Sequence, residues 1–379
     1  MSHAVAGPTA AQVLADYGAE VIKIERPGEG DIFRDVPGMG PSMFLAVNRG
    51  KKSVAIDLKK REGLSIFYSL VRKSDVVIEN LGPGVAEGIG INYQRIKRAN
   101  SKVIYCKIES FGKGPNEKIP AYDPILQASV GIMSTTGFPP NRFARAGISL
   151  VDMSAGLHAA IGILTLLLAR KESGRGSEIR ISLYDAASYF MSYWVVMYDL
   201  FGRDTFPLGS GHIFGSPYNL FKLREGMVYV AIANNGHWRA FCSALGFNDL
   251  LNDERYRRGT DRVRLKKSLE KAVALRLAKM ETSDVVNKLR ESGVPFGKFN
   301  TVRTLLQDQH FLGRDILKQY HFSGKSYRTI VNPTLVDGLR PFVRNNPPKI
   351  GQDTRVVLRS VLGLESDELD RLHTNGIIS

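Results

Sequence analysis

The chain has 379 residues, of which 43% are hydrophobic and 23% charged, a composition typical of a folded globular protein that excludes extensive disorder. Lys and Arg number 52 against 37 Asp and Glu, so the formal net charge is +15 and the surface attracts anions. The basic residues are spread along the chain without a nucleic-acid-binding motif. We therefore do not expect nucleic acid as the main partner; a phosphorylated cofactor such as coenzyme A is one candidate anion, and a generally charged, solvated surface explains most of the excess charge.

The apolar and cysteine patterns argue against two further classes of protein. The longest apolar run, residues 159–169, is shorter than the roughly 20 residues that cross a bilayer, and the first ten residues lack the features of a secretory signal. Cys106 and Cys242 lie far apart in unrelated contexts, and the seven histidines do not cluster. We expect a cytoplasmic protein with no membrane partner, no disulfide and no metal site.

Short helices and strands alternate along the chain up to about residue 112. The pattern predicts helices at 10–17, 60–74 and 93–102, and strands at 21–24, 53–56, 75–81 and 102–112. This alternation is typical of an α/β fold, a doubly wound layer around a parallel sheet. A glycine-rich run from Gly82 to Gly90 follows the third strand, at the end where such proteins bind ligands, although a structural turn would give the same run.

The pattern changes after Tyr122. We predict helix from 123, a long apolar and buried helix at 149–174 closed by Gly174, a strand at 177–184 and a helix at 186–201. The stretch 202–217 is rich in Gly, Pro and Ser and is the best candidate for a domain boundary. A hairpin with its turn at Glu225-Gly226 and a set of helices follow it.

Asp152 stands at the start of the long apolar helix. The local pattern favours an N-cap, a common role for aspartate. A carboxylate in that place faces the positive end of the helix dipole, which keeps it ionised. An ionised carboxylate in a water-poor cleft is also what covalent catalysis by aspartate requires. The two roles are compatible, although local sequence by itself favours the N-cap.

Several motifs, in this order along the chain, resemble those of the family III coenzyme A (CoA) transferases, also called the CaiB/BaiF family, which include formyl-CoA transferase and carnitine CoA-transferase. The strongest are AGPTAAQVLADYGAEVIKIERPGEGD at 6–31, NRGKKS at 48–53, ENLGPGV at 79–85, AYDPILQASVG at 121–131, DMSAGLHAAIGIL at 152–164, SGVPFG at 292–297 and IGQDTRVVLRSVLGL at 350–364. The resemblance runs from about residue 3 to the C-terminus.

The resemblance implies roles for named residues. The family's nucleophilic aspartate falls on Asp152, and a glycine-rich loop that closes over the active site looks like 208–212. Its lid positions would be Gly209, Gly211 and His212. The implied CoA contacts are Arg26, Ile56, Lys59, Asn80, Leu81, Gly82, Tyr122 and Asp123.

The implied reaction moves CoA from an acyl-CoA donor to a carboxylic acid. Asp152 attacks the thioester to give an acyl-aspartyl anhydride, and the released thiolate then attacks the aspartyl carbonyl to give an aspartyl-CoA thioester. The acceptor acid reverses these steps. CoA and acyl-CoA are substrates, and no permanently bound cofactor is expected. Because every intermediate is an activated acyl group, water has to be excluded.

The resemblance also implies an architecture. We expect a large Rossmann-like CoA-binding domain at 1–200, a smaller α+β domain at 201–305 and a return to the large domain at 306–379, in an interlocked homodimer. Relatives of this family carry a β-strand before the AGP motif, which stands almost at the start of this chain. We therefore expect that the natural chain begins earlier than this numbering.

Two alternatives remain open. The fold also hosts 2-methylacyl-CoA racemases, isomerases that use a histidine where this chain has Tyr122, and a tyrosine, with an ordinary pKa near 10, is a poor base at neutral pH. A non-catalytic CoA-binding protein is the second alternative. The acid pair is open as well, and Arg142 and Arg145 could pair with a second carboxylate or lie in a solvated loop.

Overall fold

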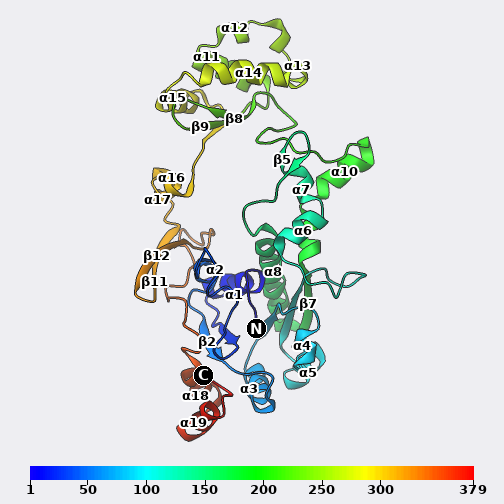
Figure 1. The fold of residues 1–379 in the computed structure, drawn as a ribbon, viewed down its shortest axis with the longest axis vertical. Helices are drawn as coiled ribbons and strands as arrows, with labels where there is room; N and C mark the ends of the chain where they lie inside the picture. Colours follow the sequence, from blue (N-terminus) through cyan, green and yellow to red (C-terminus); the bar gives the residue numbers. More distant parts are fainter. The chain divides into compact units, whose positions relative to one another are not determined.

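The computed structural model describes residues 1–379, which fold into two compact units (Figure 1). Unit 1 contains Met1–Met133, Arg145–Thr205 and Asp315–Ser379, and unit 2 contains Ser134–Ala144 and Phe206–Arg314. The segment Ser134–Ala144, expected in the large domain, belongs to unit 2, where the Gly209 amide donates to the Gly137 carbonyl at 2.7 Å. The divisions after Thr205 and Arg314 also lie a few residues beyond the expected 200 and 305.

Unit 1 is built from alternating helices and strands. Its elements are α1 (Ala6–Asp16), β1 (Ile22–Glu25), α2 (Ser42–Val47), β2 (Lys52–Ala55), α3 (Arg61–Arg72), β3 (Val76–Glu79), α4 (Val85–Gly88), α5 (Tyr93–Ala99), β4 (Ile104–Glu109), α6 (Asp123–Ser129), α8 (Leu150–Ser173), β7 (Ser177–Ser182), α9 (Leu183–Tyr189), α10 (Ser192–Phe201), β11 (Leu317–Phe322), β12 (Lys325–Ile330), α18 (Thr354–Leu362) and α19 (Ser366–Thr374). The short helix α7 (Ile132–Thr135) spans the first division between the units.

The parallel strands of unit 1 form two sheets instead of the single doubly wound sheet expected. One has the order β3-β4-β7 and the other pairs β1 with β2, and all neighbours are parallel. The first residues of the chain contact both sheets: the Met1 amine donates to the Ile78 carbonyl of β3 at 2.9 Å, and Lys23 of β1 donates to the Ser2 carbonyl at 2.7 Å. The α/β class with parallel sheets is confirmed.

Close packing of α1 against α8 forms the centre of unit 1. Ala6, Ala10 and Leu14 of α1 share a buried cluster with Val151, Ala155, Ala159 and Ile163 of α8 and with β4. Gly156 allows this approach, because a Cβ there would lie 2.7 Å from the Ala6 carbonyl oxygen. Small residues therefore bring the start of α1 beside the first turns of α8.

The other face of α8 is exposed, which differs from the expectation of a buried helix. Met153, Leu157, Ile161, Leu164 and Leu168 are 43–66% exposed and recur at intervals of three and four residues, so they form one stripe. By length and composition alone α8 could cross a membrane, but its buried face belongs to the core of unit 1. The helix predicted at 186–201 is in fact two helices, α9 and α10, separated at Phe190–Met191.

The C-terminal part of unit 1 holds strand β2 in place. Asp353 accepts a hydrogen bond from the Ser53 amide at 2.9 Å, and Thr354 accepts one from the Ala55 amide at 3.0 Å. Ile56, directly after β2, forms a bridge with Ile378. Residues about 300 positions apart thus fix the loop that follows β2.

Unit 2 has a three-stranded antiparallel sheet of order β10-β9-β8, covered by helices that share its own apolar core. The predicted hairpin is confirmed, with Gly226 at φ +76° in the turn between β8 and β9. The elements of unit 2 are β5 (Gly137–Phe138), β6 (Arg142–Phe143), β8 (Tyr218–Lys222), β9 (Met227–Ala231), α11 (Asn235–Leu245), α12 (Asn248–Leu251), a 3-10 turn (Glu254–Tyr256), α13 (Gly259–Arg264), α14 (Lys266–Leu277), α15 (Thr282–Ser292), β10 (Phe296–Lys298), α16 (Val302–Leu305) and α17 (Gln309–Gly313).

Candidate active site

Asp123 and Asp152 meet at the N-terminus of α8. Asp152 lies inside the first turn of the helix, so the predicted N-cap role is wrong. Asp123, the first residue of α6, caps the helix instead: its Oδ2 accepts hydrogen bonds from the backbone N–H groups of Val151 at 2.7 Å and Asp152 at 3.2 Å. The Asp152 carboxyl group is therefore free of a capping role.

A glutamine completes the surroundings of Asp123. Gln127, one turn later on α6, donates to Asp123 Oδ1 at 2.5 Å and accepts from the Ala146 amide at 2.8 Å. Asp123 is only 4% exposed, and its two oxygens accept three hydrogen bonds from neutral donors. The segment entering α8 is thus tied to α6 at two points.

The electrostatic setting of Asp152 also differs from the expectation. Burial, and then the neighbouring charge of Asp123, raise the pKa of the Asp152 carboxyl group to about 7. A helix dipole contributes about 0.3–1 kcal/mol, and one pKa unit corresponds to about 1.4 kcal/mol, so the dipole offsets less than one unit. The carboxyl group is therefore poised to change charge near neutral pH.

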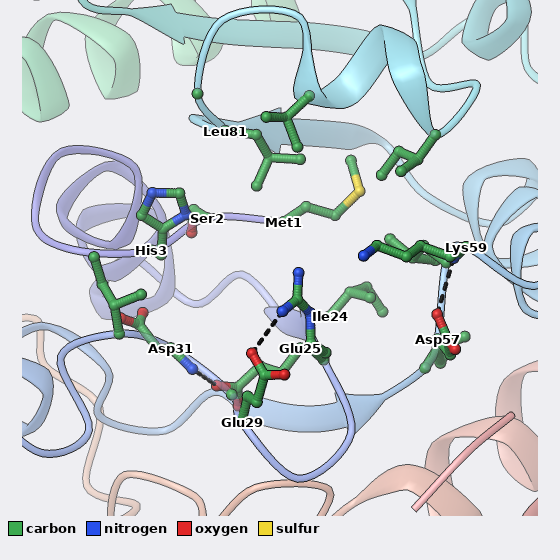
Figure 2. A pocket seen from close by; sticks show the side chains of 18 residues that line it. Met1, Ser2, His3, Ile24, Glu25, Glu29, Asp31, Asp57, Lys59 and Leu81 are labelled. Carbon is green, nitrogen blue, oxygen red and sulfur yellow. Dashed lines mark hydrogen bonds and ion pairs between the residues drawn. The ribbon is translucent and has the colours of Figure 1, made fainter. Parts of the chain in front are cut away.

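A cavity of about 310 Å³ opens beyond the carboxyl ends of β1 and β2 of one parallel sheet and of β3 of the other (Figure 2). Arg26 follows β1, the stretch Ile56–Lys59 follows β2, and Leu81 and Gly82 follow β3, and all of them line it. The carboxyl ends of parallel strands are where open α/β sheets bind ligands. Five of the eight residues predicted to contact CoA, which are Arg26, Ile56, Lys59, Leu81 and Gly82, are therefore brought together.

Cations and carboxylates share the rim of this cavity. Arg26 pairs with Glu29 at 2.5 Å, and both side chains are more than half exposed. The exposed Lys59 ammonium group forms no ion pair, while its backbone N–H donates to Asp57 at 3.0 Å (Figure 2). A phosphate that enters the cavity could bind Lys59, which is unpaired, and Arg26, whose ion-pair partner is the solvated carboxylate of Glu29.

The wall of the cavity contains polar residues that the sequence analysis missed. Asp31 lines the cavity and forms a buried ion pair at 2.7 Å with Lys23, which lies behind the wall, and Asp31 also accepts from the Ala4 amide at 3.2 Å. Burial by itself raises the pKa of the Asp31 carboxyl group, but Lys23 and the backbone donors lower it overall. The only indication of this ion pair in the sequence is the lysine, Lys23, inside the apolar strand VIKIE.

Asn80 does not line the cavity but fixes the chain that does. Its amide group accepts from the His3 N–H at 2.9 Å and donates to the His3 carbonyl at 3.0 Å. His3 faces the cavity, and burial is the main cause that lowers the pKa of its imidazole. A Cβ at Gly7 would lie 2.8 Å from the Asn80 side-chain oxygen, so glycine is needed for this contact.

The remaining predicted residues lie elsewhere. Tyr122 precedes α6, is 62% exposed and does not line the cavity, and Asp123 contacts α8 instead. Gly209, Gly211 and His212 belong to unit 2, whereas Asp152 and the cavity belong to unit 1. No group of three or more His, Cys, Asp or Glu side chains is placed to hold a metal ion.

Comparisons with known proteins show the family to which this chain belongs. Residues 1–354 match the family described as CoA-transferase family III. The succinate–glutarate CoA-transferase of Agrobacterium fabrum is 30% identical over 96% of this chain and 94% of the relative, and the acetyl-CoA:oxalate CoA-transferase of Acetobacter aceti is 34% identical over 78% of each. The crystal structure of a CAIB/BAIF family protein from Brucella suis superposes with a TM-score of 0.86, at 30% identity, over 95% of this chain and 97% of that one.

This chain belongs to CoA-transferase family III, and the resemblance drawn from its motifs is confirmed. It is an enzyme of the CoA-transferase class.

The raised pKa of Asp152 predicts a gain in stability when its charge is removed. In the folded chain the Asp152 carboxyl group keeps its proton up to about pH 7, whereas an aspartate in the unfolded chain releases it at about pH 3.9. The free energy of unfolding therefore falls as pH rises between these values, and Asp152→Asn removes this loss. We expect the variant to be more stable by on the order of 2 kcal/mol at pH 8, with a much smaller gain at pH 4.5.

Urea denaturation of both proteins at the two pH values measures this difference. A variant that is less stable than the wild type at pH 8, or equally stabilised at both values, contradicts the assigned environment of Asp152.

Proposed function

We propose that this enzyme moves CoA from an acyl-CoA donor to a carboxylic acid acceptor through covalent intermediates on Asp152. The observation that carries the proposal is the state of Asp152. Its carboxyl group is half-buried, has a pKa of about 7 and does not cap α8, because Asp123 caps this helix instead. A carboxylate in such a place is poorly solvated once ionised, and this makes it more nucleophilic than an aspartate in water. Family membership supports the reaction class.

The reaction proceeds in four balanced steps. The Asp152 carboxylate attacks the donor carbonyl, the C–S bond breaks, and CoA leaves as a thiolate from an acyl-aspartyl anhydride. The thiolate attacks the aspartyl carbonyl and expels the donor acid as a carboxylate, leaving an aspartyl-CoA thioester. The acceptor carboxylate attacks that thioester to form a second anhydride and release the thiolate. The thiolate then attacks the acceptor carbonyl, giving the new acyl-CoA and free Asp152.

CoA is proposed to bind in the cavity at the ends of β1, β2 and β3. Arg26 and Lys59 provide the positive charge for its phosphates, and Leu81 and Gly82 provide the apolar and backbone surface opposite them. Binding would draw Arg26 away from Glu29, an exposed pair that is worth little by itself.

The acceptor is proposed to be a small dicarboxylic acid. Relatives that match most of this chain are named for succinate, glutarate and oxalate, which all carry a second carboxylate. A net charge of +15 favours the approach of such anions. The racemase alternative is less favoured, because the exposed Tyr122 is not paired with Asp152 by any observed contact.

Replacing the proposed nucleophile tests the reaction directly. With succinyl-CoA as donor and glutarate or oxalate as acceptor, we expect Asp152→Ala to lower transfer by about 10³-fold or more while CoA still binds. Asp367→Ala, at an exposed aspartate in the first turn of α19, is the matched control and should retain activity. Hydroxylamine trapping after incubation with acyl-CoA, followed by mass spectrometry, should modify Asp152. Retained transfer in Asp152→Ala would overturn the proposal.

The charge of Asp123, in addition to burial, should influence the pH dependence of transfer. Because Asp152 has to be ionised to attack, kcat/KM should rise with pH through about pH 7 and level off above it. Asp123→Asn keeps an oxygen that can cap α8 but removes the charge that helps to raise the Asp152 pKa. We expect the acidic limb of the kcat/KM profile to move to lower pH in this variant. An unchanged limb, or one moved to higher pH, would show that another group controls it.

The exposed apolar stripe of α8 is proposed to be covered by a second copy of the chain, as in the homodimer that the family resemblance implies. Five large apolar side chains on one face of one helix are more than single scattered surface residues. The two ends of the stripe are Met153 and Leu168, and Ile161 near its middle is 63% exposed.

A charge on this stripe should separate the copies. We expect the wild type to sediment as a dimer and Ile161→Asp to shift toward monomer, because an interface would bury an unpaired carboxylate. Val356→Asp, at a 65% exposed valine on α18, is the control and should remain a dimer. A monomeric wild type that binds lipid vesicles through α8 would contradict this assignment.

A further inference from the structure

The charged side chains around the cavity of unit 1 do not by themselves favour a phosphate. Carboxylates outnumber the Lys and Arg side chains that line it, and the six residues are Glu25, Glu29, Asp31, Asp57, Arg26 and Lys59. Like charges at short range repel, so uncompensated carboxylates here would oppose the binding of phosphates. The groups that neutralise these carboxylates therefore matter as much to the site as the cations that face it.

Glu25, the last residue of β1, accepts four hydrogen bonds although its side chain is only 2% exposed. Its Oε1 accepts from the Asp31 N–H at 2.9 Å and from Arg34 Nε at 2.9 Å. Its Oε2 accepts from Arg34 Nη2 at 2.5 Å and from the Ser53 hydroxyl at 2.6 Å. The bond to Asp31 closes the loop that carries Arg26 (Figure 2). Glu25 thus fixes the segment that presents one of the two proposed phosphate ligands.

Arg34 neutralises Glu25 from behind the cavity wall. Its guanidinium group binds the carboxylate through two nitrogens, and its side chain does not line the cavity. The third nitrogen donates to the Pro348 carbonyl at 3.0 Å, and the guanidinium carbon lies 4.0 Å from the ring centre of the buried Phe44. The guanidinium group is therefore held at several points in one orientation, with its charge directed at Glu25.

Two further contacts fix the loop and the ion pair together. Ser53, which donates to Glu25, accepts a hydrogen bond from the Gly351 N–H at 3.0 Å. A Cβ at Gly30 would lie 2.9 Å from Arg34 Cδ, so glycine allows the loop to pass close to the arginine. The C-terminal part of unit 1 and the loop are thus both packed against the same buried ion pair.

We propose that Arg34 is a positioning residue that cancels the charge of Glu25, so that Glu25 can hold the loop 26–31 without repelling the phosphates of CoA. The inference rests on the proposed function, in which CoA binds in this cavity. It gives one ion pair two effects, an orienting effect on the loop and an electrostatic effect on the ligand. Arginine supplies both, because its planar fork binds a carboxylate at two points, whereas lysine supplies a single point of charge.

The electrostatic effect is tested by measuring the affinity for CoA with titration calorimetry. We expect Arg34→Met to weaken CoA binding by about tenfold or more, because the Glu25 carboxylate is left uncompensated near the phosphates. The double variant Arg34→Met/Glu25→Gln removes this charge but keeps an oxygen that can accept from the Asp31 N–H. It should bind CoA about threefold or more tighter than Arg34→Met, whereas a purely structural role predicts no recovery. Arg371→Met, which breaks an exposed ion pair with Glu62, is the matched control and should bind CoA like the wild type.

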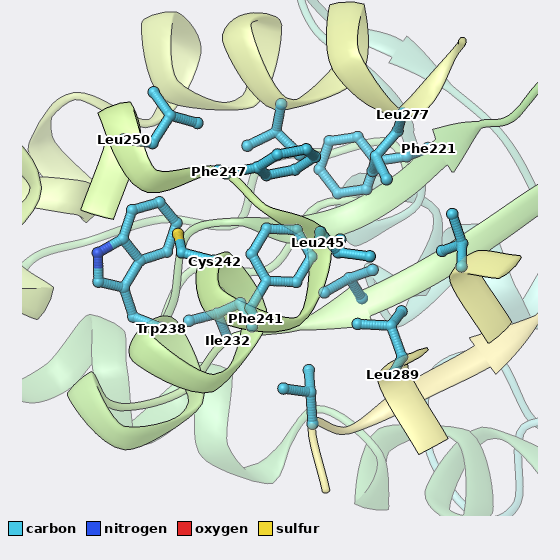
Figure 3. Packing of buried hydrophobic residues seen from close by; sticks show 14 of the residues in the cluster. Phe221, Ile232, Trp238, Phe241, Cys242, Leu245, Phe247, Leu250, Leu277 and Leu289 are labelled. Carbon is cyan, nitrogen blue, oxygen red and sulfur yellow. The ribbon is translucent and has the colours of Figure 1, made fainter. Parts of the chain in front are cut away.

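The orienting effect is tested by hydrogen exchange. We expect exchange at 26–31 to be roughly tenfold faster in Arg34→Met and about threefold faster in Arg34→Lys, which keeps the charge without the two-point contact. Helix α11 is the internal reference, because Phe241 and Leu245 lie buried in the separate core of unit 2 (Figure 3), and its exchange should not change. Arg34→Lys also keeps the test informative if Arg34→Met does not fold, since its CoA affinity should stay within about threefold of the wild type.

Each remaining outcome decides one part of the inference. A double variant that binds CoA no better than Arg34→Met, or a tenfold loss of affinity in Arg34→Lys, overturns the charge-cancelling role. Unchanged exchange at 26–31 in both single variants overturns the positioning role. Failure of the proposed function appears separately, as unchanged CoA affinity in Lys59→Met, which would place CoA outside this cavity. Weaker binding in Lys59→Met without any change in Arg34→Met overturns this inference alone.

Discussion

Two carboxyl groups, Asp123 and Asp152, share the N-terminus of one helix, and the proposed chemistry depends on this arrangement. Asp123 uses its oxygens to cap α8 and to accept from Gln127, so its charge is fixed in place. Asp152, next to it in the first helical turn, is left without those contacts and its pKa is raised to about 7. Two carboxylates close together in a partly buried site lower the stability of the folded chain. Such a loss of stability is common at the reactive residues of enzymes.

The rest of unit 1 holds this pair and the cavity at the ends of β1, β2 and β3 in position. Small residues let α1 lie against α8, and Asn80 fixes the chain leading into α1 by two hydrogen bonds to His3. The C-terminal residues Asp353 and Thr354 bond to strand β2, which leads into the stretch that contains Lys59. The cavity is thus lined by residues from the first 89 positions, and one of the strands that leads to it is supported by the C-terminal part of unit 1.

The sequence predicted the cavity better than it predicted the nucleophile's surroundings. The family resemblance implied Arg26, Lys59 and Leu81 as CoA contacts, and the structure places all three around one cavity, each after a strand with a recognisable apolar pattern. The state of Asp152 could not be predicted in this way, because the group that caps α8 lies 28 residues upstream on another helix. Local patterns identify a helix start, but they do not show which side chain caps it.

Other differences have the same origin in contacts between distant residues. The segment 134–144 belongs to unit 2 because Gly137 bonds to Gly209, and the expected single sheet is two sheets whose strands pair only within each set. The glycine-rich stretch 202–217 was recognised from its composition. Lys266, which contacts the His212 and Gly215 carbonyls in this stretch, lies on helix α14 about 50 residues later and could not be recognised in the same way. Such pairings depend on packing, which periodicity along the chain does not encode.

The most direct test of the central claim follows oxygen atoms through one turnover. In the proposed mechanism an oxygen of the acceptor carboxylate becomes the bridge of the second anhydride and remains on Asp152 when the new acyl-CoA leaves. After a single turnover with ¹⁸O-labelled acceptor acid, the peptide that contains Asp152 should gain about 2 Da by mass spectrometry, the mass of one ¹⁸O. An unlabelled peptide after complete transfer would contradict covalent catalysis by Asp152.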